Sequence, residues 1–312
     1  MVQAAPRLFA AGEAWPTIYT RPMIDRRALL LGGLALGAGC AGHPQEARRA
    51  RADFRGLQAM LGPGGRLGVA ALDTGTGRWL LHDENGRYAM ASTFKLPLAA
   101  AILGEVEAGR LALDREIPFT RADLVPYAPV VEANLERGHL PLERLCAAIV
   151  EVSDNAAANL LLARIGGPAG LTRFCRAHGD TVTQLDRTEP ELNANLPGDR
   201  RDTTSPAAMA GLMRTLLLGE ALRAASRARL IGWMQGATTG LQRLRAGLPA
   251  GWRAGDKTGN GANGAANDLA IAFPPGRAPI LIACYMSGGT AERPARDAVH
   301  ASVARAVASA FA

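Results

Sequence analysis

The tetrapeptide Ser92-Thr93-Phe94-Lys95 opens an Ala/Leu-rich region that runs to about Gly232 with the periodicity of helices. On a helix, residues i and i+3 lie on one face, so the hydroxyl of Ser92 and the amine of Lys95 can meet. A serine at the start of a helix also lies beside backbone N–H groups that have no partner within the helix. The tetrapeptide therefore predicts a nucleophile with a candidate base beside it.

Lys95 and Lys257 are the two lysines among 35 basic residues. Arginine is effectively always protonated, whereas a buried or crowded lysine can lose its proton. A codon-biased genome would also leave two lysines without a special role, so the sequence around them decides. Lys257 begins Lys257-Thr258-Gly259 at the end of a strand-like segment. A charge and a hydroxyl there can hold a carboxylate, and glycine lets the backbone approach closely.

A third motif, Ser153-Asp154-Asn155, lies at a break between helical stretches and offers a second hydroxyl and a carboxamide. Each motif by itself is weak evidence, because short patterns recur by chance. All three occur in one order along the chain, and both lysines lie inside them. This combination favours an active site over the alternative of a helix cap, a turn and a strand end.

With these motifs the chain resembles the class A serine β-lactamases, for which S-x-x-K, S-D-N and K-T-G are characteristic. Three further stretches support the resemblance. Residues 187–193 (RTEPELN) resemble the Ω-loop motif of the family, residues 238–247 precede the DKTG run as they do in the family, and residues 127–130 (YAPV) resemble its cleft-edge segment. The resemblance extends from about residue 65 to the C-terminus.

The resemblance assigns catalytic roles to the matching residues. It implies that Ser92 attacks the lactam carbonyl and forms an acyl-enzyme, and that Ser153 passes a proton to the departing ring nitrogen. It implies that Glu189, with Asn193, activates the water that cleaves the acyl-enzyme. Lys95 and Glu189 both stay open as the base for acylation.

The resemblance also implies a set of substrate contacts. The backbone N–H groups of Ser92 and Asn260 would form the oxyanion hole. Asn155 would bind the amide of the substrate side chain, and Tyr127 would lie at the edge of the cleft. The residues expected to hold the substrate carboxylate are Lys257, Thr258 and Arg243. Many relatives have an arginine where Ala266 stands, so Arg243 is expected to reach that space from a neighbouring strand.

The segment 186–203 is expected to form the Ω-like loop. Arg187 and Asp202 are predicted to pair across its neck, with two solvated surface charges as the alternative. The resemblance implies a cis peptide bond between Glu189 and Pro190. In some relatives, cysteines at the positions of Ala91 and Gly261 form a disulfide with each other. This chain has no cysteine at either position, and the disulfide is therefore absent.

Strand signals at both ends of the chain, with helices between them, predict the fold class. We expect an α/β lobe with an antiparallel sheet, formed by residues 42–88 and 237–312, packed on an all-helical lobe of residues 89–236, with the active site between them. The elements expected in the α/β lobe are a helix at 47–60, strands at 67–72, 78–82, 253–257, 268–273 and 279–286, a hairpin turn at 73–77, and a helix at 293–311.

Residues 1–41 are expected to be a leader. Arg26 and Arg27 precede a short apolar run, which indicates an export signal of the twin-arginine type over residues 23–41, with residues 1–22 as an upstream extension. The protein is therefore expected to be periplasmic or secreted. A lipid anchor at Cys40 and plain cleavage nearby both stay open.

The composition excludes several other classes. The chain is 48% hydrophobic and 20% charged, which is typical of a folded protein, and its net charge of +7 comes from scattered arginines that do not indicate nucleic-acid binding. The five histidines have no metal-ligand spacing, so neither a metal nor a cofactor is expected. Outside the leader, Cys146, Cys175 and Cys284 are expected to be buried thiols, with at least one of them free. Residues 259–264 match GxGxxG, but they lead into a strand rather than a helix, which argues against dinucleotide binding.

The protein is expected to be a monomer that hydrolyses β-lactams. Two other functions are alternatives to this hydrolysis. One is acyl transfer on cell-wall peptide, and the other is a sensor that stays acylated. Glu189 and Asn193 argue against the first, because a deacylating water distinguishes hydrolysis from trapping. A sensor is usually tethered by several transmembrane spans, and the sequence outside the leader has no segment long and apolar enough to form one.

Overall fold

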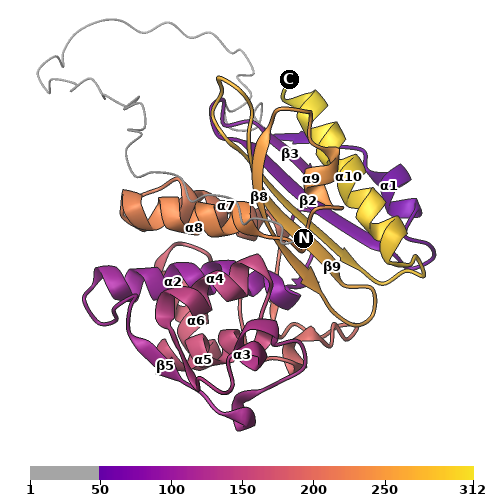
Figure 1. The fold of residues 1–312 in the computed structure, drawn as a ribbon. Coiled ribbons are helices and arrows are strands. Elements are labelled where there is room, and N and C mark those ends of the chain that lie inside the picture. Colours follow the sequence, from indigo (N-terminus) through magenta and orange to yellow (C-terminus); the bar gives the residue numbers. More distant parts are fainter. Residues whose placement is uncertain (1–48) are drawn as a thin grey trace, which may run out of the picture. The chain divides into compact units, whose positions relative to one another are not determined.

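The computed structural model describes residues 49–312, so the predicted leader and Cys40 lie outside the described residues. A six-stranded sheet runs through the described part, with helices on both of its faces (Figure 1). Among these helices, none is both long and apolar enough to cross a membrane.

The sheet joins the two ends of the described chain. Its strands, in spatial order, are β1 (Arg49–Arg51), β3 (Trp79–His82), β2 (Arg66–Asp73), β10 (Ile280–Ser287), β9 (Ala266–Phe273) and β8 (Arg253–Asn260). All neighbours are antiparallel except β1 and β3. In the central pair, Ile280 lies opposite Asp73 and Ser287 opposite Arg66. The predicted discontinuous antiparallel sheet is therefore confirmed.

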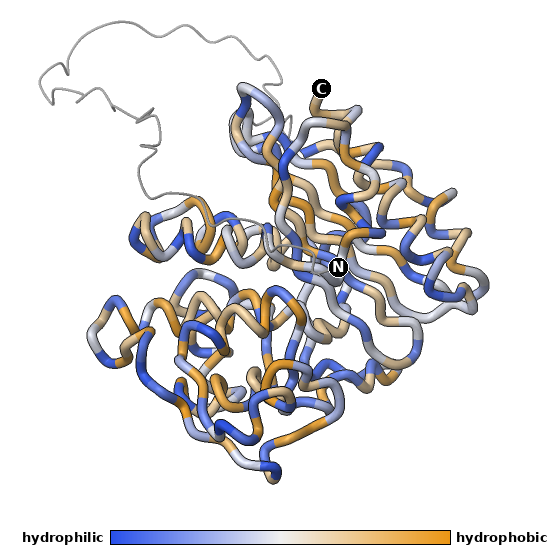
Figure 2. The backbone as a smooth tube through the Cα atoms, viewed as in Figure 1, coloured by the Kyte–Doolittle hydropathy of each residue, from blue (hydrophilic) through white to orange (hydrophobic). Residues whose placement is uncertain are grey.

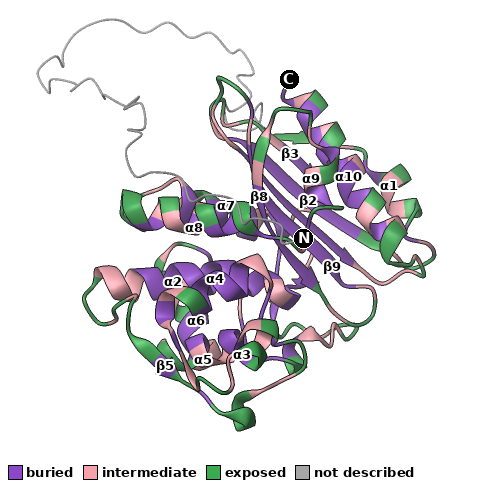
Figure 3. Ribbon diagram, in the orientation of Figure 1, coloured by how far each residue is buried: buried purple, intermediate pink, exposed green. Residues whose placement is uncertain are grey.

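Side chains along the central strands alternate between two cores, as the period of two in a strand requires. Leu281, Ala283 and Tyr285 of β10 belong to the core shared with most of the helices. Ile282 and Cys284 belong to the core beneath the C-terminal helix. Both faces of the central sheet are thus covered, which is why these strands are hydrophobic along their length (Figure 2) and buried (Figure 3).

One face of the sheet is covered by short helices and the C-terminal helix. These are α1 (Arg55–Ala59), α9 (Leu244–Gly247) and α10 (Arg293–Ala310). The other face meets α7 (Pro206–Leu217) and α8 (Ala224–Gly236), and the remaining helices pack beyond them. Those are α2 (Lys95–Glu107), α3 (Pro129–Ala133), α4 (Leu142–Glu151), α5 (Asn155–Arg164) and α6 (Gly167–Ala177). The boundaries chosen above for the two lobes stay a prediction.

The predicted helix over residues 47–60 is wrong in its first part. Residues 49–51 form β1, whose backbone pairs with β3 at the edge of the sheet. The Asp53 carboxylate accepts a hydrogen bond from the backbone N–H of Arg55 at 3.1 Å, and the helix α1 begins only there. The helical pattern over residues 47–60 is weak, because α1 has no apolar face. Backbone pairing of residues 49–51 at the sheet edge outweighs this pattern.

The predicted helical region also contains short strand pairs that the sequence did not reveal. These are β5 (Glu116–Pro118) with β6 (His139–Pro141), and β4 (Tyr88–Ala89) with β7 (Thr203–Thr204). Each is two or three residues long and joins segments distant in the sequence, so it leaves no periodic signal. The hairpin turn at 73–77 and the helix at 293–311 are confirmed.

Gly259 places β8 directly against the turn that carries Ser92. A Cβ atom at Gly259 would lie 2.7 Å from the carbonyl oxygen of Met90 and 3.2 Å from the backbone nitrogen of Ser92. Both contacts are with backbone, which cannot rotate away. Glycine is therefore required here so that the strand and the turn can approach.

We predict that Gly259→Ala lowers the free energy of unfolding by about 1–3 kcal/mol, because the added methyl group overpacks two backbone segments. Gly211→Ala is the matched control. Gly211 lies within α7, and a Cβ atom there would meet nothing within 4 Å. This control should be neutral or stabilising by up to about 1 kcal/mol, because alanine is the better helix former. Urea denaturation measures both, and equal stability of the two variants would contradict the close approach of β8.

Candidate active site

Ser92 and Lys95 meet at the start of α2, as predicted. Ser92 lies in a 3-10 turn over Ala91–Phe94, and Lys95 is the first residue of α2. The Lys95 Nζ donates a hydrogen bond to Ser92 Oγ at 2.9 Å. Ala91 has a φ of +43°, an unfavourable backbone conformation for a residue other than glycine. Such strain is found at functional sites, where the surroundings hold it in place.

Ser153 lies in the turn between α4 and α5, Asn155 is the first residue of α5, and both contact Lys95. The Lys95 Nζ donates to the Ser153 carbonyl at 2.9 Å and to Asn155 Oδ1. The Asn155 Nδ2 donates to the carbonyl of Pro126 at 2.8 Å, which fixes the direction of its amide. The Ser153 backbone has a φ of +65°, so this residue also lies in a strained turn.

Asp154 ties three segments of this site together. Its Oδ1 accepts from the backbone N–H of Ala157 at 2.8 Å and caps α5. Its Oδ2 accepts from the N–H groups of Val130 and Val131 at 2.8 and 3.0 Å. These residues follow Tyr127, whose carbonyl accepts from the N–H of Asn155 at 3.0 Å. Asp154 therefore holds the segment of Tyr127 beside Ser153, a positioning role that the motif alone did not reveal.

Lys257 approaches the same serine from the sheet. Its Nζ donates to Ser153 Oγ at 3.0 Å and to the carbonyl of Thr258 at 2.8 Å. The Lys95 Nζ lies 3.3 Å from the same Ser153 Oγ. The Ser153 hydroxyl thus lies between the two amines, and both lysines of the chain belong to one site.

Burial of the two amines shifts their proton affinity. Removal from water lowers the pKa of Lys95, although the carboxylate of Glu189 opposes this shift. Burial lowers the pKa of Lys257 well below its usual value, and the positive charge of Lys95 adds to the effect. Each ammonium group therefore loses its proton more readily here than lysine does in water, so a larger fraction of each side chain is the neutral amine.

Glu189 completes the cluster around Ser92. One carboxylate oxygen lies 3.0 Å from Lys95 Nζ and 3.3 Å from Ser92 Oγ. The other oxygen accepts from Asn193 Nδ2 at 2.5 Å. Glu189 is 2% exposed, so this carboxylate is held among partners rather than in solvent. The peptide bond between Glu189 and Pro190 is cis, as expected.

Asn159 supports Glu189 and was missed by the sequence analysis. Its Oδ1 accepts from the backbone N–H of Glu189 at 3.0 Å, and its Nδ2 donates to the carbonyl of the same residue at 2.9 Å. Asn159 lies one helical turn after Asn155 on α5. That spacing is the sole signal in the sequence that could have indicated it.

Arg187 and Asp202 pair at the neck of the loop at 2.5 Å, which excludes two solvated charges. Asp202 is fully buried, and its Oδ1 accepts from the backbone N–H groups of Asp186 and Arg187 at 2.8 and 2.9 Å. The pair thus holds both ends of the segment that carries Glu189.

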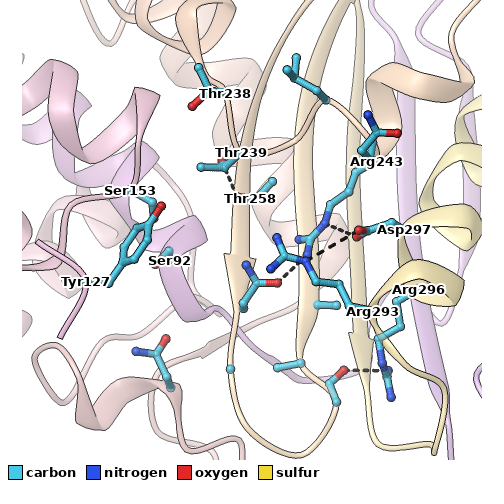
Figure 4. Close-up of a pocket in the computed structure, with 18 of the residues that line it drawn as sticks. Ser92, Tyr127, Ser153, Thr238, Thr239, Arg243, Thr258, Arg293, Arg296 and Asp297 are labelled. Carbon is cyan, nitrogen blue, oxygen red and sulfur yellow. Dashed lines mark hydrogen bonds and ion pairs between the residues drawn. The ribbon is translucent and has the colours of Figure 1, made fainter. Parts of the chain in front are cut away.

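A cleft of about 920 Å³ lies above this cluster. Ser92, Ser153 and Tyr127 lie on one side of it, and Arg243, Arg293 and Asp297 lie on the other, with Thr258 of β8 between them (Figure 4). Tyr127 is 60% exposed at its edge. The other residues of the predicted site that line the cleft are Asn155, Asn193 and Asn260. Lys95, Glu189 and Lys257 are buried beneath this lining.

Arg243 reaches the space beside Ala266, but not from a strand. It lies in the turn before α9, and its Nη1 donates to the carbonyl of Asn267 at 2.8 Å. The expectation of a neighbouring strand was wrong because residues 239–243 form a turn against β8 rather than a strand. Thr239, also missed, shares a hydrogen bond of 2.7 Å with Thr258 between their hydroxyls.

The remaining sequence expectations concern thiols and the GxGxxG pattern. Cys146, Cys175 and Cys284 are buried and free. Residues 261–265 connect β8 to β9, so the pattern spans a strand–turn–strand unit rather than a nucleotide-binding turn. Within residues 49–312, no group of three or more His, Cys, Asp or Glu side chains could hold a metal ion.

A model of the beta-lactamase enzyme family matches residues 54–311. The structure is similar to that of the class A beta-lactamase of the last common ancestor of Gram-negative bacteria, with a TM-score of 0.81 and 53% identity over 83% of this chain and 98% of that one. The chain belongs to the class A beta-lactamases.

Two natural class A relatives show the same similarity. The chain is 45% identical to beta-lactamase AST-1 of Nocardia asteroides over 83% of this chain and 84% of the relative. It is 46% identical to the carbapenem-hydrolyzing beta-lactamase KPC of Klebsiella oxytoca over 78% of this chain and 83% of the relative. Both matches cover most of the two chains compared, so the family's activity, hydrolysis of β-lactams, belongs to this chain.

We predict that Asp202→Asn lowers the free energy of unfolding by about 2–4 kcal/mol, because it leaves the Arg187 guanidinium facing an amide at a buried site. The asparagine keeps an oxygen for the two backbone N–H groups, so the loss reports the charge. Asp114→Asn, at an exposed position, is the control and should be near neutral. Chemical denaturation measures both, and a loss no larger than that of the control would show that the loop neck does not depend on the ion pair.

The back of β8 carries a second buried charge. Asp256 is fully buried and forms an ion pair with Arg245. Burial raises the pKa of Asp256 to about 6, although Arg245 opposes the shift. Burial also raises the pKa of Asp268 well above its usual value, and the charge of Asp256 adds to it. These two acids lie on adjacent strands behind the site, with Asp256 next to Lys257 in the chain.

We predict that the titration of Asp256 lowers the free energy of unfolding as the pH rises from about 4 to about 7. Between its ordinary value of 3.8 and about 6, the folded state keeps the Asp256 proton that the unfolded chain releases. The stability gained from the neutral form is present below pH 3.8 and is lost as the pH rises through 6. The free energy of unfolding of wild type minus that of Asp256→Asn should therefore fall over this range, by about 1–3 kcal/mol. Urea titrations at several pH values measure it, and a difference that rises with pH would contradict the raised pKa.

Proposed function

We propose that this class A beta-lactamase hydrolyses penicillin- and cephalosporin-type antibiotics through an acyl-enzyme on Ser92, which a water activated by Glu189 then removes. The observation that carries the proposal is the position of Ser92 Oγ. It lies 2.9 Å from the Lys95 amine and 3.3 Å from the Glu189 carboxylate, at the floor of an open cleft. Nucleophile, base and second base are thus within hydrogen-bond reach of one another.

In acylation, Ser92 Oγ attacks the lactam carbonyl and gives its proton to Lys95 or Glu189, both of which contact it. The lowered pKa of Lys95 favours a fraction of neutral amine. The backbone N–H groups of Ser92 and Asn260 hold the oxyanion. As the amide bond breaks, Ser153 passes a proton to the ring nitrogen and recovers one from the amines beside it.

Substrate binding uses the lining of the cleft. Lys257, Thr258 and Arg243 attract the carboxylate of the substrate from the side of β8. Asn155 offers its amide to the substrate side chain, and Tyr127 covers the opposite edge. The contacts of Lys257 and Arg243 with the protein hold their side chains at the wall where this carboxylate would lie.

In deacylation, a water held by Glu189 and Asn193 attacks the acyl carbonyl. Glu189 takes the proton from this water, and Ser92 Oγ leaves with a proton to restore the enzyme. The hydrogen bond from Asn193 Nδ2 and the two bonds from Asn159 fix the carboxylate and its backbone for this step. This arrangement favours hydrolysis over cell-wall acyl transfer and over a sensor that stays acylated.

We predict that Glu189→Ala still becomes acylated but turns over about 10²- to 10⁴-fold more slowly, because it lacks the base for the deacylating water. A chromogenic cephalosporin measures turnover, and intact-mass spectrometry detects an adduct with the mass of the whole substrate. Glu191→Ala is the matched control, since Glu191 is exposed two residues away. Turnover by Glu189→Ala at the rate of this control would contradict the proposed role, and a single stoichiometric burst by wild type would favour the two competing functions.

We further infer that the protein is exported. The twin-arginine-type pattern in residues 23–41 and the export that is typical of class A beta-lactamases support this. Cleavage near Cys40 and lipidation of that residue remain the two alternatives, which the mass of the mature N-terminal peptide distinguishes. A kinetic panel of penicillin, cephalosporin and carbapenem substrates defines the spectrum, with the carbapenem arm motivated by the similarity to a carbapenem-hydrolyzing relative.

A further inference from the structure

Three arginines line the cleft on the side away from Ser92. They are Arg243, which precedes α9, and Arg293 and Arg296 in the first turn of α10. Asp297 lies among them (Figure 4). The proposed reaction gives a role only to Arg243, so the charge of the other two is unexplained. The number of N–H donors that each guanidinium leaves free determines which of them can still bind a ligand.

Arg243 has almost no free donor. Its Nε donates to Asp297 Oδ1 at 2.7 Å, and its Nη1 donates to the carbonyls of Gly259 and Asn267 at 3.3 and 2.8 Å. Its Nη2 donates to Asn260 Oδ1 at 2.5 Å. Four of the five N–H groups of a guanidinium are therefore used, and the side chain is 1% exposed. One N–H remains for the substrate carboxylate.

Arg296 uses four of its five N–H groups to hold backbone. Its Nε donates to the carbonyl of Ala291 at 2.8 Å, and its Nη1 donates to that of Gly264 at 2.9 Å. Its Nη2 donates to the carbonyls of Gly288 and Gly289 at 2.9 and 3.3 Å. Arg296 is buried, and it ties the β8–β9 turn to the segment before α10. Its role is structural.

Arg293 differs from both. Its side chain is 69% exposed, and its one charged neighbour is Asp297, at 3.8 Å from Nε. The closer contact of Asp297 is with Arg243, at 2.7 Å. One carboxylate thus faces two guanidinium groups, so a net positive charge remains on this wall. Within residues 49–312, the side chain of Arg293 donates no hydrogen bond to the protein, and Arg293 lines the cleft.

We propose that Arg293 is a specificity residue for β-lactams that carry a second negative charge, on the substituent next to the ring carboxylate. This inference rests on the proposed function, which places the ring carboxylate at Lys257, Thr258 and Arg243. Through Asp297, Arg293 is the next guanidinium along that wall. A cephalosporin carries an exchangeable substituent on the carbon adjacent to its carboxylate-bearing carbon, and an acidic group there would extend toward Arg293. A free guanidinium binds such a group by charge and by paired N–H donors.

The test uses two cephalosporins with the same acyl side chain, one with an acidic and one with a neutral heterocycle at this position. Wild type, Arg293→Ala and Arg293→Glu are compared, with Arg305→Ala as the control. Arg305 is an exposed arginine on the same helix α10 that does not line the cleft. We expect Arg293→Ala to lower kcat/KM for the acidic substrate about threefold to tenfold, mainly through KM, as for an exposed charge contact. Arg293→Glu should lower it further, and added salt should reduce the wild-type preference.

Three outcomes would overturn the inference. If Arg293→Ala lowers kcat/KM equally for both substrates, Arg293 acts through the fold. If Arg293→Ala and Arg305→Ala have equal kcat/KM on the acidic substrate, Arg293 does not contact the acidic group. Either result leaves the proposed function standing. Failure of wild type to turn over both cephalosporins would overturn the proposed function together with the inference.

Discussion

The contact on which the site depends is the burial of the Lys95 ammonium among oxygen atoms. Removing a charge from water is costly unless partners surround it. Here Ser92, Glu189, Ser153 and Asn155 all supply oxygen atoms to one nitrogen. These partners come from three separate segments, so the chain must bring the start of α2, the α4–α5 turn and the loop of Glu189 together. The geometry of the reacting groups follows from satisfying this one amine.

Polar groups, in addition to the apolar core, hold together the segments that converge on Lys95. Asp154, Asn159 and Asp202 each bind backbone atoms of another segment. Buried carboxylates and amides are suited to this, because each fixes two or more N–H groups that would otherwise lack a partner. They also hold Ser153 in a strained backbone conformation that it would leave on its own. The reaction site is thus rigid although most of its residues lie on loops and turns.

The sheet side of the cleft follows a different principle. Burial on β8 disfavours the charges of Lys257 and Asp256, and both depend on compensating neighbours. Arg243 uses four of its five N–H groups on carbonyl groups, Asn260 and Asp297, so it presents a fixed positive wall more than a set of free donors. Exposed groups at the rim, Arg293 among them, remain available to contact parts of a substrate far from Ser92. The fixed charges thus lie near the reacting atoms, whereas the adaptable groups lie apart from them at the rim.

The sequence by itself indicated which residues gather at the cleft and where the main elements lie. The two lysines within their motifs and the strands around residues 253–286 could be predicted from local spacing and periodicity, and the Arg187–Asp202 pair from the resemblance of its loop. Tertiary structure alone decided the contacts of Asn159 and Asp297, the strand at 49–51 and the number of hydrogen bonds of Arg243. Each of these depends on partners distant in the chain. Such contacts leave no pattern along the sequence, since the number of hydrogen bonds that a side chain makes is set by what the fold places around it.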